Sequence, residues 1–404
     1  MIIRREDIMF NIFNKKNRFK RVFLVVLDSV GCGEAKDASK FNDVGAHTLK
    51  HVIEANKENS YKNLSKLGLF NLVYDYNLPT MSYYTKANEI SNGKDTLTGH
   101  LEMMGINTVK PYKTFTETGF PKELIDELEK RTNRKVIGNC NASGTEIIKE
   151  LGVEQMNTGS IIVYTSADSV LQIAAHEDIV PVPELYKICE IARELTLKDE
   201  WKVGRIIARP FIGSNGEFTR TANRKDFALN PPASTVLDEL KKKKLSVISI
   251  GKIADIFNEC GITSKIHIED NTDGIRQIVK MVHQDFTGLC FANLNDFDSK
   301  YGHRRNPIGY GNALREVDEA LPHILAHLTD DDLLIITADH GNDPTYRGTD
   351  HTREKTPVFI YSSSFKEPKR LEELDTFGSL GATIADNFNI KAPVIGKSFL
   401  DKLK

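Results

Sequence analysis

Acidic and histidine side chains gather directly after the buried strands that the sequence predicts, and these residue types bind divalent cations in proteins. Asp28 follows the apolar run 22–27, and Asp339 and His340 follow the run 333–337 in the sequence T-A-D-H-G-N. His351 comes eleven residues later, in G-T-D-H-T. Because ligands of parallel sheets bind beyond the carboxyl ends of the strands, we expect these side chains to lie close together. Taken alone, Asp28 could equally cap a helix or end a strand.

A third segment, N-L-N-D-F-D-S-K-Y-G-H, follows the predicted strand near residue 291 and adds His303 and two aspartates. Asp296 and Asp298 compete there for one ligand role, and the other is interpreted as a turn residue. Like charges held close together repel and raise each other's pKa, and divalent cations remove that cost. Three aspartates and three histidines suit two cations about 3.5–4 Å apart, as in phosphoryl-transfer sites. Mixed oxygen and nitrogen ligands fit manganese, zinc or magnesium.

The motif G-K-D-T-L-T-G-H at 93–100 carries two hydroxyl groups at a predicted helix start. Asp95 and Thr96 are good N-cap residues. A hydroxyl there meets free backbone N–H groups and the positive end of the helix dipole, which suit a phosphate. A metal beside it would lower its pKa and make it a nucleophile. From this segment alone a plain threonine cap is the simpler explanation, and spacing does not choose between Thr96 and Thr98.

Alternating helices and buried strands must position these residues. The C-terminal half shows the alternation in predicted helices at 235–243, 275–282 and 314–328 and predicted strands at 245–250, 289–292, 333–337 and 358–361. This order predicts an open, mostly parallel α/β sheet. The more polar and less regular stretch 113–228 predicts a smaller α+β domain inserted into the sheet domain. The sheet domain would then consist of 21–112 and 229–404.

The composition is that of an ordinary soluble, globular protein. The chain has 404 residues, of which 40 % are hydrophobic, enough for a sizeable core. A net charge of −2 disfavours binding to nucleic acid or to a membrane surface. The five scattered cysteines lack a C-x-x-C spacing and favour a reducing cytosol. Residues 1–20 lack a signal-peptide pattern, and we interpret them as an N-terminal extension, disordered or upstream of a true start such as Met9.

Several long motifs, in the right order, resemble the phosphopentomutase family of the alkaline phosphatase superfamily. The resemblance runs from about Arg21 to the C-terminus. Its motifs are R-V-F-L-V-V-L-D-S-V-G-C-G-E (21–34), G-K-D-T-L-T-G-H-L-E-M-M-G (93–105), N-A-S-G-T-E (141–146), F-T-R-T-A-N-R-K-D (218–226), N-D-F-D-S-K-Y-G-H-R-R-N-P (295–307), T-A-D-H-G-N-D-P-T (337–345) and G-T-D-H-T-R-E (348–354). D-H-G-N alone would identify only the superfamily. One departure is Leu101, where the family motif G-H-W-E has tryptophan.

The resemblance implies an alkaline-phosphatase-like core, with a mostly parallel sheet flanked by helices, and an inserted α+β cap domain that recognises the substrate. It implies that Thr96 becomes phosphothreonine. One manganese ion would be bound by Asp298, His303 and His351, and the other by Asp28, Asp339 and His340 together with the Thr96 oxygen. Substrate contacts would come from Asp168 and Ser166 in the cap domain and from Lys252 after the strand that ends at Ile250.

The implied reaction interconverts α-D-ribose 1-phosphate and D-ribose 5-phosphate, and the 2-deoxyribose pair, through a sugar bisphosphate, in nucleoside salvage. The implied cofactors are two Mn²⁺, with other divalent cations possible, and a sugar bisphosphate activator such as glucose 1,6-bisphosphate. The cap must close, because water would otherwise hydrolyse phosphothreonine. We expect a cytoplasmic monomer that binds pentose phosphates and neither nucleic acid nor a membrane.

Three alternatives stay open. A phosphatase or sulfatase, or another phosphomutase of the superfamily, would use the same metals. A cofactor-independent phosphoglycerate mutase is disfavoured, since that family uses a serine nucleophile in a different motif. A catalytically inactive metal-binding protein is disfavoured by the complete set of ligands and the hydroxyl.

Overall fold

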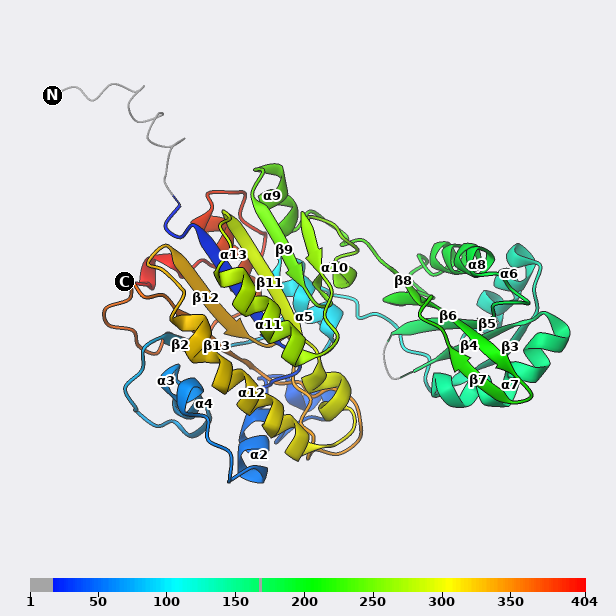
Figure 1. The fold of residues 1–404 in the computed structure, drawn as a ribbon, viewed down its shortest axis with the longest axis horizontal. Coiled ribbons are helices and arrows are strands. Elements are labelled where there is room, and N and C mark those ends of the chain that lie inside the picture. Colours follow the sequence, from blue (N-terminus) through cyan, green and yellow to red (C-terminus); the bar gives the residue numbers. More distant parts are fainter. Residues whose placement is uncertain (1–16, 167–168) are drawn as a thin grey trace, which may run out of the picture. The chain divides into compact units, whose positions relative to one another are not determined.

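The computed structural model describes residues 17–166 and 169–404, which form two compact units (Figure 1). The core unit runs up to Val109 and resumes at Pro231, and the inserted unit is Lys110–Asn230. The sequence placed these junctions at 112/113 and 228/229. Among the described residues, no helix has the length and apolar character needed to cross a membrane.

The core unit is built on a seven-stranded sheet in the order β10-β9-β11-β1-β12-β13-β2. Its strands are β1 (Arg21–Leu27), β2 (Tyr83–Ala87), β9 (Ser246–Ile250), β10 (Ser264–Ile266), β11 (Gly288–Leu294), β12 (Asp332–Thr337) and β13 (Thr356–Tyr361). The five strands from β10 to β12 are parallel, whereas β13 and β2 pair antiparallel at one edge. The mostly parallel α/β sheet expected from the sequence is therefore confirmed.

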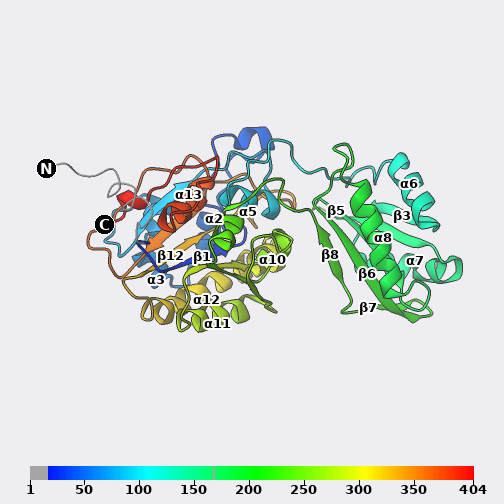
Figure 2. The same cartoon turned by 90° about the horizontal axis from the view of Figure 1, so that it is seen from above.

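Strand β1 lies inside the sheet, which explains its continuous apolar sequence. Phe23, Val25 and Leu27 pack into the hydrophobic cluster on one face, and Val22, Leu24 and Val26 into the cluster on the other. Helices cover both faces, with α11 and α12 on the first and α13 on the second (Figure 2). The first face carries α2 (Thr48–Ala55), α3 (Lys62–Lys66), α4 (Leu69–Tyr74), α11 (Asn271–Val282) and α12 (Pro307–Leu325). The second carries α5 (Thr96–Met103), α9 (Val236–Lys242), α10 (Ile253–Ile256) and α13 (Gly378–Asn387).

The inserted unit has a sheet of its own, in the order β3-β4-β5-β6-β7, with β8 paired to β6. Its strands are β3 (Val136–Asn141), β4 (Ile161–Thr165), β5 (Val170–His176), β6 (Arg205–Ser214), β7 (Glu217–Arg220) and β8 (Lys225–Ala228). Helices α6 (Lys122–Thr132) and α8 (Val182–Leu195) pack on one face, and α7 (Gly144–Thr158) packs on the other. Parallel and antiparallel pairs are mixed in this sheet.

Candidate active site

The six side chains predicted to bind metal lie in two adjoining groups. The strand cluster consists of Asp28, Asp339 and His340, and the turn cluster consists of Asp298, His303 and His351. Within each cluster, one ligand atom from every residue lies within 4.8 Å of the others. The rings of His340 and His351 stack with their centroids 4.0 Å apart, so the two clusters are neighbours.

The strand cluster follows the ends of β1 and β12 and is fully buried. His340 Nε2 lies 3.4 Å from Asp28 Oδ1 and 3.4 Å from Asp339 Oδ2. Both of these carboxylate oxygens are buried without a hydrogen-bond partner. His340 Nδ1 lies 3.0 Å from the Gly341 carbonyl oxygen, and its Nε2 atom faces the two carboxylates. Buried carboxylates are costly unless they are neutralised, so this donor set fits a divalent cation.

The two carboxylates of the strand cluster create a negative environment that stabilises a positive charge placed between them. Burial acts to lower the pKa of His340, but the carboxylates of Asp339 and Asp28 outweigh burial and hold that pKa well above its ordinary value. Burial acts to raise the pKa of Asp339, whereas His340 and His100 lower it to about 2. The carboxyl group of Asp339 is therefore held in the charged form that binds metal.

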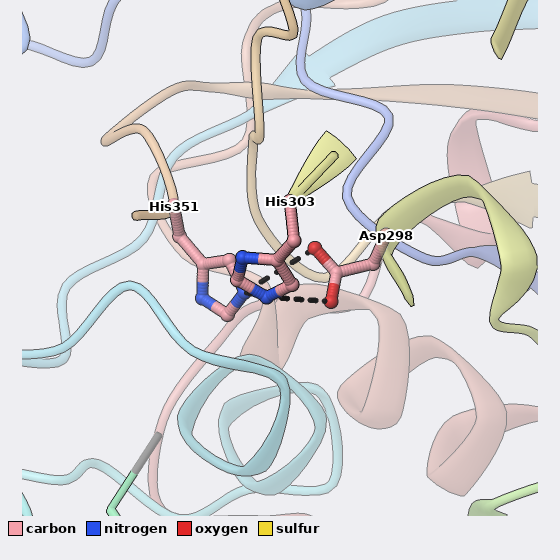
Figure 3. A group of neighbouring side chains, drawn as sticks. All are labelled: Asp298, His303 and His351. Carbon is pink, nitrogen blue, oxygen red and sulfur yellow. Dashed lines mark hydrogen bonds and ion pairs between the residues drawn. The ribbon is translucent and has the colours of Figure 1, made fainter. Parts of the chain in front are cut away.

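A π-helical turn, Phe297–Gly302, builds the turn cluster. The His303 N–H donates to the Asp298 carbonyl at 3.0 Å, an i→i+5 bond that brings two residues five positions apart to the same side. Asp298 Oδ2 lies 3.2 Å from His303 Nε2, and Asp298 Oδ1 lies 3.2 Å from His351 Nε2 (Figure 3). Burial acts to raise the pKa of Asp298, but His351 and His303 hold it well below its ordinary value. A carboxylate between two imidazole nitrogens is a suitable ligand set for manganese or zinc.

Thr96 begins α5, and Asp95 caps this helix by accepting a hydrogen bond from the Thr98 N–H at 3.1 Å. The Oγ1 atom of Thr96 lies 3.2 Å from His340 Nε2, so its hydroxyl joins the strand cluster. The Thr98 hydroxyl is buried and donates to Asp95 at 2.6 Å. The structure thus separates the two threonines that spacing alone left open.

A buried network that the sequence analysis did not select supports the strand cluster. Asn293 Nδ2 donates to Asp28 Oδ2 at 3.0 Å and lies 3.3 Å from His100 Nε2. His100 Nδ1 lies 2.8 Å from the Thr96 carbonyl and 3.3 Å from Asp339 Oδ2. This network links the helix that carries Thr96 to both aspartates. The available signal was a polar Asn293 within the apolar strand sequence of β11 and the position of His100 in the G-H motif.

The turn cluster has similar support. Asn342 Nδ2 donates to Asp298 Oδ1 at 2.7 Å, and Arg305 Nη1 donates to Asn342 Oδ1 at 2.7 Å. Asp296, the competing aspartate, is engaged elsewhere and accepts from the Asn271 N–H and from Lys300, each at 2.9 Å. Asp298 therefore takes the position beside the histidines.

Three other predicted residues, Lys252, Ser166 and Asp168, do not belong to either cluster. Lys252 is the N-cap residue of α10, directly after β9, and β11 separates β9 from β1. Ser166 directly follows β4 in the inserted unit, and Asp168 lies outside the described residues. Leu101 is buried in the apolar cluster on the α5 face of the sheet, so this departure from the family motif removes no ligand.

The family model described as Metalloenzyme superfamily matches residues 20–392. Among solved structures, the chain is similar to the PH0037 protein of Pyrococcus horikoshii (14 % identity, TM-score 0.48, 93 % of this chain and 98 % of that one). It is also similar to a phosphoglycerate mutase of Leishmania mexicana (9 % identity, TM-score 0.48, 95 % of this chain and 98 % of that one). A third similar structure is the alkaline phosphatase of the Antarctic bacterium TAB5 (11 % identity, TM-score 0.35, 93 % of this chain and 100 % of that one). At these identities, none of the three says which substrate this chain takes.

Proposed function

The chain belongs to the Metalloenzyme superfamily, and we propose that it is a phosphopentomutase that interconverts α-D-ribose 1-phosphate and D-ribose 5-phosphate, and the 2-deoxyribose pair. The observation that carries this proposal is the position of Thr96 Oγ1, 3.2 Å from His340 Nε2. A hydroxyl that lies at a helix N-terminus and beside metal ligands is placed to accept and donate a phosphoryl group. The G-K-D-T motif and its resemblance to the phosphopentomutases support the choice of substrate.

We assign two Mn²⁺ to the two clusters, one held by the strand cluster and one by the turn cluster, and other divalent cations suit the same ligands. When bound, the cations neutralise the carboxylates, lower the pKa of the Thr96 hydroxyl and stabilise the charge of the transferring phosphoryl group. His100 and Asn293 keep Asp339 and Asp28 oriented, because each contacts an oxygen of one of these carboxylates.

In the proposed cycle, phospho-Thr96 gives its phosphoryl group to a hydroxyl of a bound pentose monophosphate. The bond between phosphorus and Thr96 Oγ1 breaks and a bond between phosphorus and the sugar oxygen forms, while the proton of the sugar hydroxyl passes to the Thr96 oxygen. The resulting bisphosphate reorients and gives its other phosphate to Thr96 by the same chemistry, which releases the isomeric monophosphate and restores phospho-Thr96. A sugar bisphosphate such as glucose 1,6-bisphosphate would start the cycle by phosphorylating Thr96.

Three further assignments belong to the same proposal. Asp168 and Ser166 recognise the sugar, and Lys252 binds a substrate phosphate. If Asp168 holds the sugar, Asp168→Ala should lower mutase turnover more than phosphorylation of Thr96, since orientation of the bisphosphate is lost. We propose a monomer that works in the cytoplasm on small pentose phosphates and binds neither nucleic acid nor a membrane.

The test is phosphorus NMR of the protein with Mn²⁺, ribose 5-phosphate and glucose 1,6-bisphosphate as primer. The expected result is a ribose 1-phosphate signal that reaches a constant ratio to ribose 5-phosphate. Release of inorganic phosphate in its place would identify a phosphatase of the superfamily and overturn the mutase.

Variants of the two threonines test the nucleophile. Thr96→Ala should be inactive even with the primer, and Thr96→Ser should keep a measurable fraction of turnover because it retains the hydroxyl. Thr98→Ala, the matched control, should keep some turnover although it loses the hydrogen bond to Asp95. Peptide mass spectrometry after priming should locate the phosphate on Thr96, and a phosphate on Thr98 would contradict the assignment.

A further inference from the structure

The side chain of Arg353 joins the segment that carries His351 to the loop that leads to Thr96. This loop, residues 88–95 between β2 and α5, is termed the threonine loop. Arg353 follows His351 by two residues in the motif G-T-D-H-T-R-E. Its side chain is 1 % exposed and is among the largest that the fold buries completely. A buried guanidinium is costly unless it is paired and hydrogen-bonded, so its partners show what it holds in place.

All five N–H donors of the Arg353 guanidinium are used. Nη1 donates to Glu89 Oε2 and to the Gly93 carbonyl, and Nη2 donates to the Glu89 carbonyl at 2.8 Å. The other Nη2 proton and the Nε proton are donated to the two carboxylate oxygens of Asp37, at 3.2 and 3.0 Å. Three of the five hydrogen bonds therefore end on the threonine loop. A lysine has three donors on one rotating ammonium group and cannot reproduce this planar arrangement.

The Gly93 backbone is packed against the cap of the helix that Thr96 begins. A Cβ atom on Gly93 would lie 2.7 Å from Thr98 Oγ1 and 3.0 Å from Asp95 Oδ2. These two side chains form the cap of α5 through their own hydrogen bond of 2.6 Å. A displacement of Gly93 would therefore displace the first turn of α5 and, with it, Thr96 Oγ1.

Glu102 holds the threonine loop from the helix side. Its carboxylate accepts hydrogen bonds from the Ile90 N–H at 3.1 Å and from the Ser91 N–H at 2.7 Å. Because Glu102 lies on α5, these bonds fix the loop to its own helix. Arg353 fixes the same loop to the segment that carries a metal-binding histidine.

The backbone beside Arg353 is fixed to both clusters. The Thr352 N–H donates to the Gly341 carbonyl at 2.8 Å, and the Gly341 N–H donates to the Thr352 carbonyl at 3.2 Å. These two residues directly follow His351 and His340, whose rings stack 4.0 Å apart. The guanidinium of Arg353 therefore extends from a backbone segment whose place relative to the candidate metal ligands is already set.

Lys94 makes a second connection between the same segments. Its Nζ atom lies 3.0 Å from Asp43 Oδ2 and 3.2 Å from Asp350 Oδ2. The same oxygen of Asp43 accepts a hydrogen bond from the Arg353 N–H at 2.8 Å. The threonine loop is thus joined to the His351 segment by its backbone, through Arg353, and by one of its side chains, through Lys94.

We propose that Arg353 is a positioning residue that sets the place of Thr96 Oγ1 relative to the two metal-binding clusters. The inference deepens the proposed function and rests on it for the nucleophilic role of Thr96. Phosphoryl transfer depends on the alignment of the reacting groups, and a misplacement of about 1 Å costs roughly 10²-fold in rate. Arg353 acts through the threonine loop and not through contact with the substrate, because its side chain is buried.

The test follows the transfer of phosphate from glucose 1,6-bisphosphate to Thr96 in unphosphorylated protein with Mn²⁺. Rapid mixing and intact-mass spectrometry give the rate of transfer and the final fraction of phosphorylated chains. Arg353→Lys keeps the charge and removes the planar donor set, so it should lower the rate roughly 10²-fold and leave the final fraction unchanged. A wild-type rate would overturn the proposal. A final fraction that falls with the rate would indicate lost folded protein and overturn it as well.

The matched control is Arg21→Lys, the same change in a buried arginine at the amino end of β1. Arg21 pairs with Asp332, far along the strand from the candidate metal ligands. The control should lower the unfolding temperature, as Arg353→Lys does, and leave the rate of Thr96 phosphorylation unchanged. Equal slowing by the two substitutions would show that lost stability explains the effect, and the positioning role would be wrong.

Gly93→Ala displaces the threonine loop without changing Arg353, and it decides the question if Arg353→Lys does not fold. The added Cβ atom would lie 2.7 Å from Thr98 Oγ1, so the loop must move away from the helix start. The phosphorylation rate should fall by a similar factor, while Mn²⁺ binding measured by electron paramagnetic resonance stays as in the wild type. An unchanged rate would show that the position of this loop does not control Thr96.

Hydrogen exchange separates this inference from the proposed function, because it needs no activity. In Arg353→Lys, the amides of residues 89–95 should exchange about 10-fold faster than in the wild type, the factor expected for one lost hydrogen bond to a charged group. Those of β1 and β12 should not change. If the wild type takes up no phosphate, the proposed function fails, and faster exchange would still show that Arg353 holds the loop. Unchanged exchange at residues 89–95 would overturn the inference whether or not the protein is active.

Discussion

Buried aspartates are paired with an arginine at one end of the neighbouring strands β1 and β12 and are left without a basic partner at the other end. At the amino ends, Arg21 and Asp332 are paired in register and form two hydrogen bonds of 2.7 and 2.6 Å. At the carboxyl ends, Asp28 and Asp339 each keep a buried oxygen without a partner. Among the described residues, no lysine or arginine pairs with either of them. The chain neutralises its own aspartate at one end and leaves the other end for cations that it must bind.

The largest effect is expected at the carboxyl end, from Asp339→Asn. Loss of this charge should lower turnover of ribose 5-phosphate by about 10²–10³-fold or more, the scale of removing one electrostatic group from an active site. It should also reduce the rise in unfolding temperature that we expect Mn²⁺ to produce in the wild type, since that rise depends on binding to the folded state. Calorimetry with Mn²⁺ and with chelator measures this. An unchanged Mn²⁺ effect would remove Asp339 from the ligand set.

Asp332→Asn makes the same chemical change at the amino end and should affect stability instead. It leaves the buried guanidinium of Arg21 without its counter-charge, which costs about 3–5 kcal/mol in comparable buried pairs. We expect the lower part of that range, because Arg21 also donates to the carbonyls of Val282 and Gln284. Urea denaturation gives the free energy of unfolding. Turnover of the folded variant and its response to Mn²⁺ should match the wild type, and a loss of either would break the contrast between the two ends.

Asn293→Ala and Asn342→Ala should give intermediate effects by loosening one ligand in each cluster. Each amide donates to an aspartate of its cluster, at 3.0 and 2.7 Å. Loss of such support typically costs 10–100-fold in metal affinity. Mn²⁺ titration followed by electron paramagnetic resonance should show one weakened site per variant and one unchanged. Equal weakening of both sites by either substitution would mean that the clusters bind as one unit.

The smallest effect concerns pH at the amino end. Burial acts to raise the pKa of Asp332, but hydrogen bonds from Arg21 and Thr329 lower it below its ordinary value. A lowered folded-state pKa contributes stability above the unfolded pKa of about 3.9, and this contribution is lost as the pH falls through the folded value. The stability gap between the wild type and Asp332→Asn should be full at pH 7 and narrower at pH 3. A difference in unfolding free energy that stays constant from pH 7 to pH 3 would show that the charge of Asp332 does not stabilise its pair with Arg21.

The candidate metal ligands that come after strands could be predicted from the sequence, because they follow recognisable apolar runs. Asp28 and Asp339 each come directly after an apolar run, and parallel strands bring such positions to one edge. The order of helices and strands in the core unit could be predicted for the same reason, since buried parallel strands have continuous apolar sequences.

Other features depend on contacts that no local pattern encodes. The choice between Asp296 and Asp298 follows from the π-helical turn, whose i→i+5 bond has no residue signature of its own. The pair of Arg21 and Asp332 joins positions 311 residues apart and exists only once the register of the sheet is known.

The interior position of β1 has a consequence for synthesis on the ribosome. Its two neighbours, β11 and β12, begin at Gly288 and Asp332, so ~260 residues must follow β1 before its first partner exists. At about 5–20 residues per second, the run V-F-L-V-V-L waits on the order of 10–50 s after it is made. An unpaired apolar strand is prone to aggregate during that time. The strands of the inserted unit meet their partners much earlier, so β1, the first strand of the described residues, is among the last to be paired.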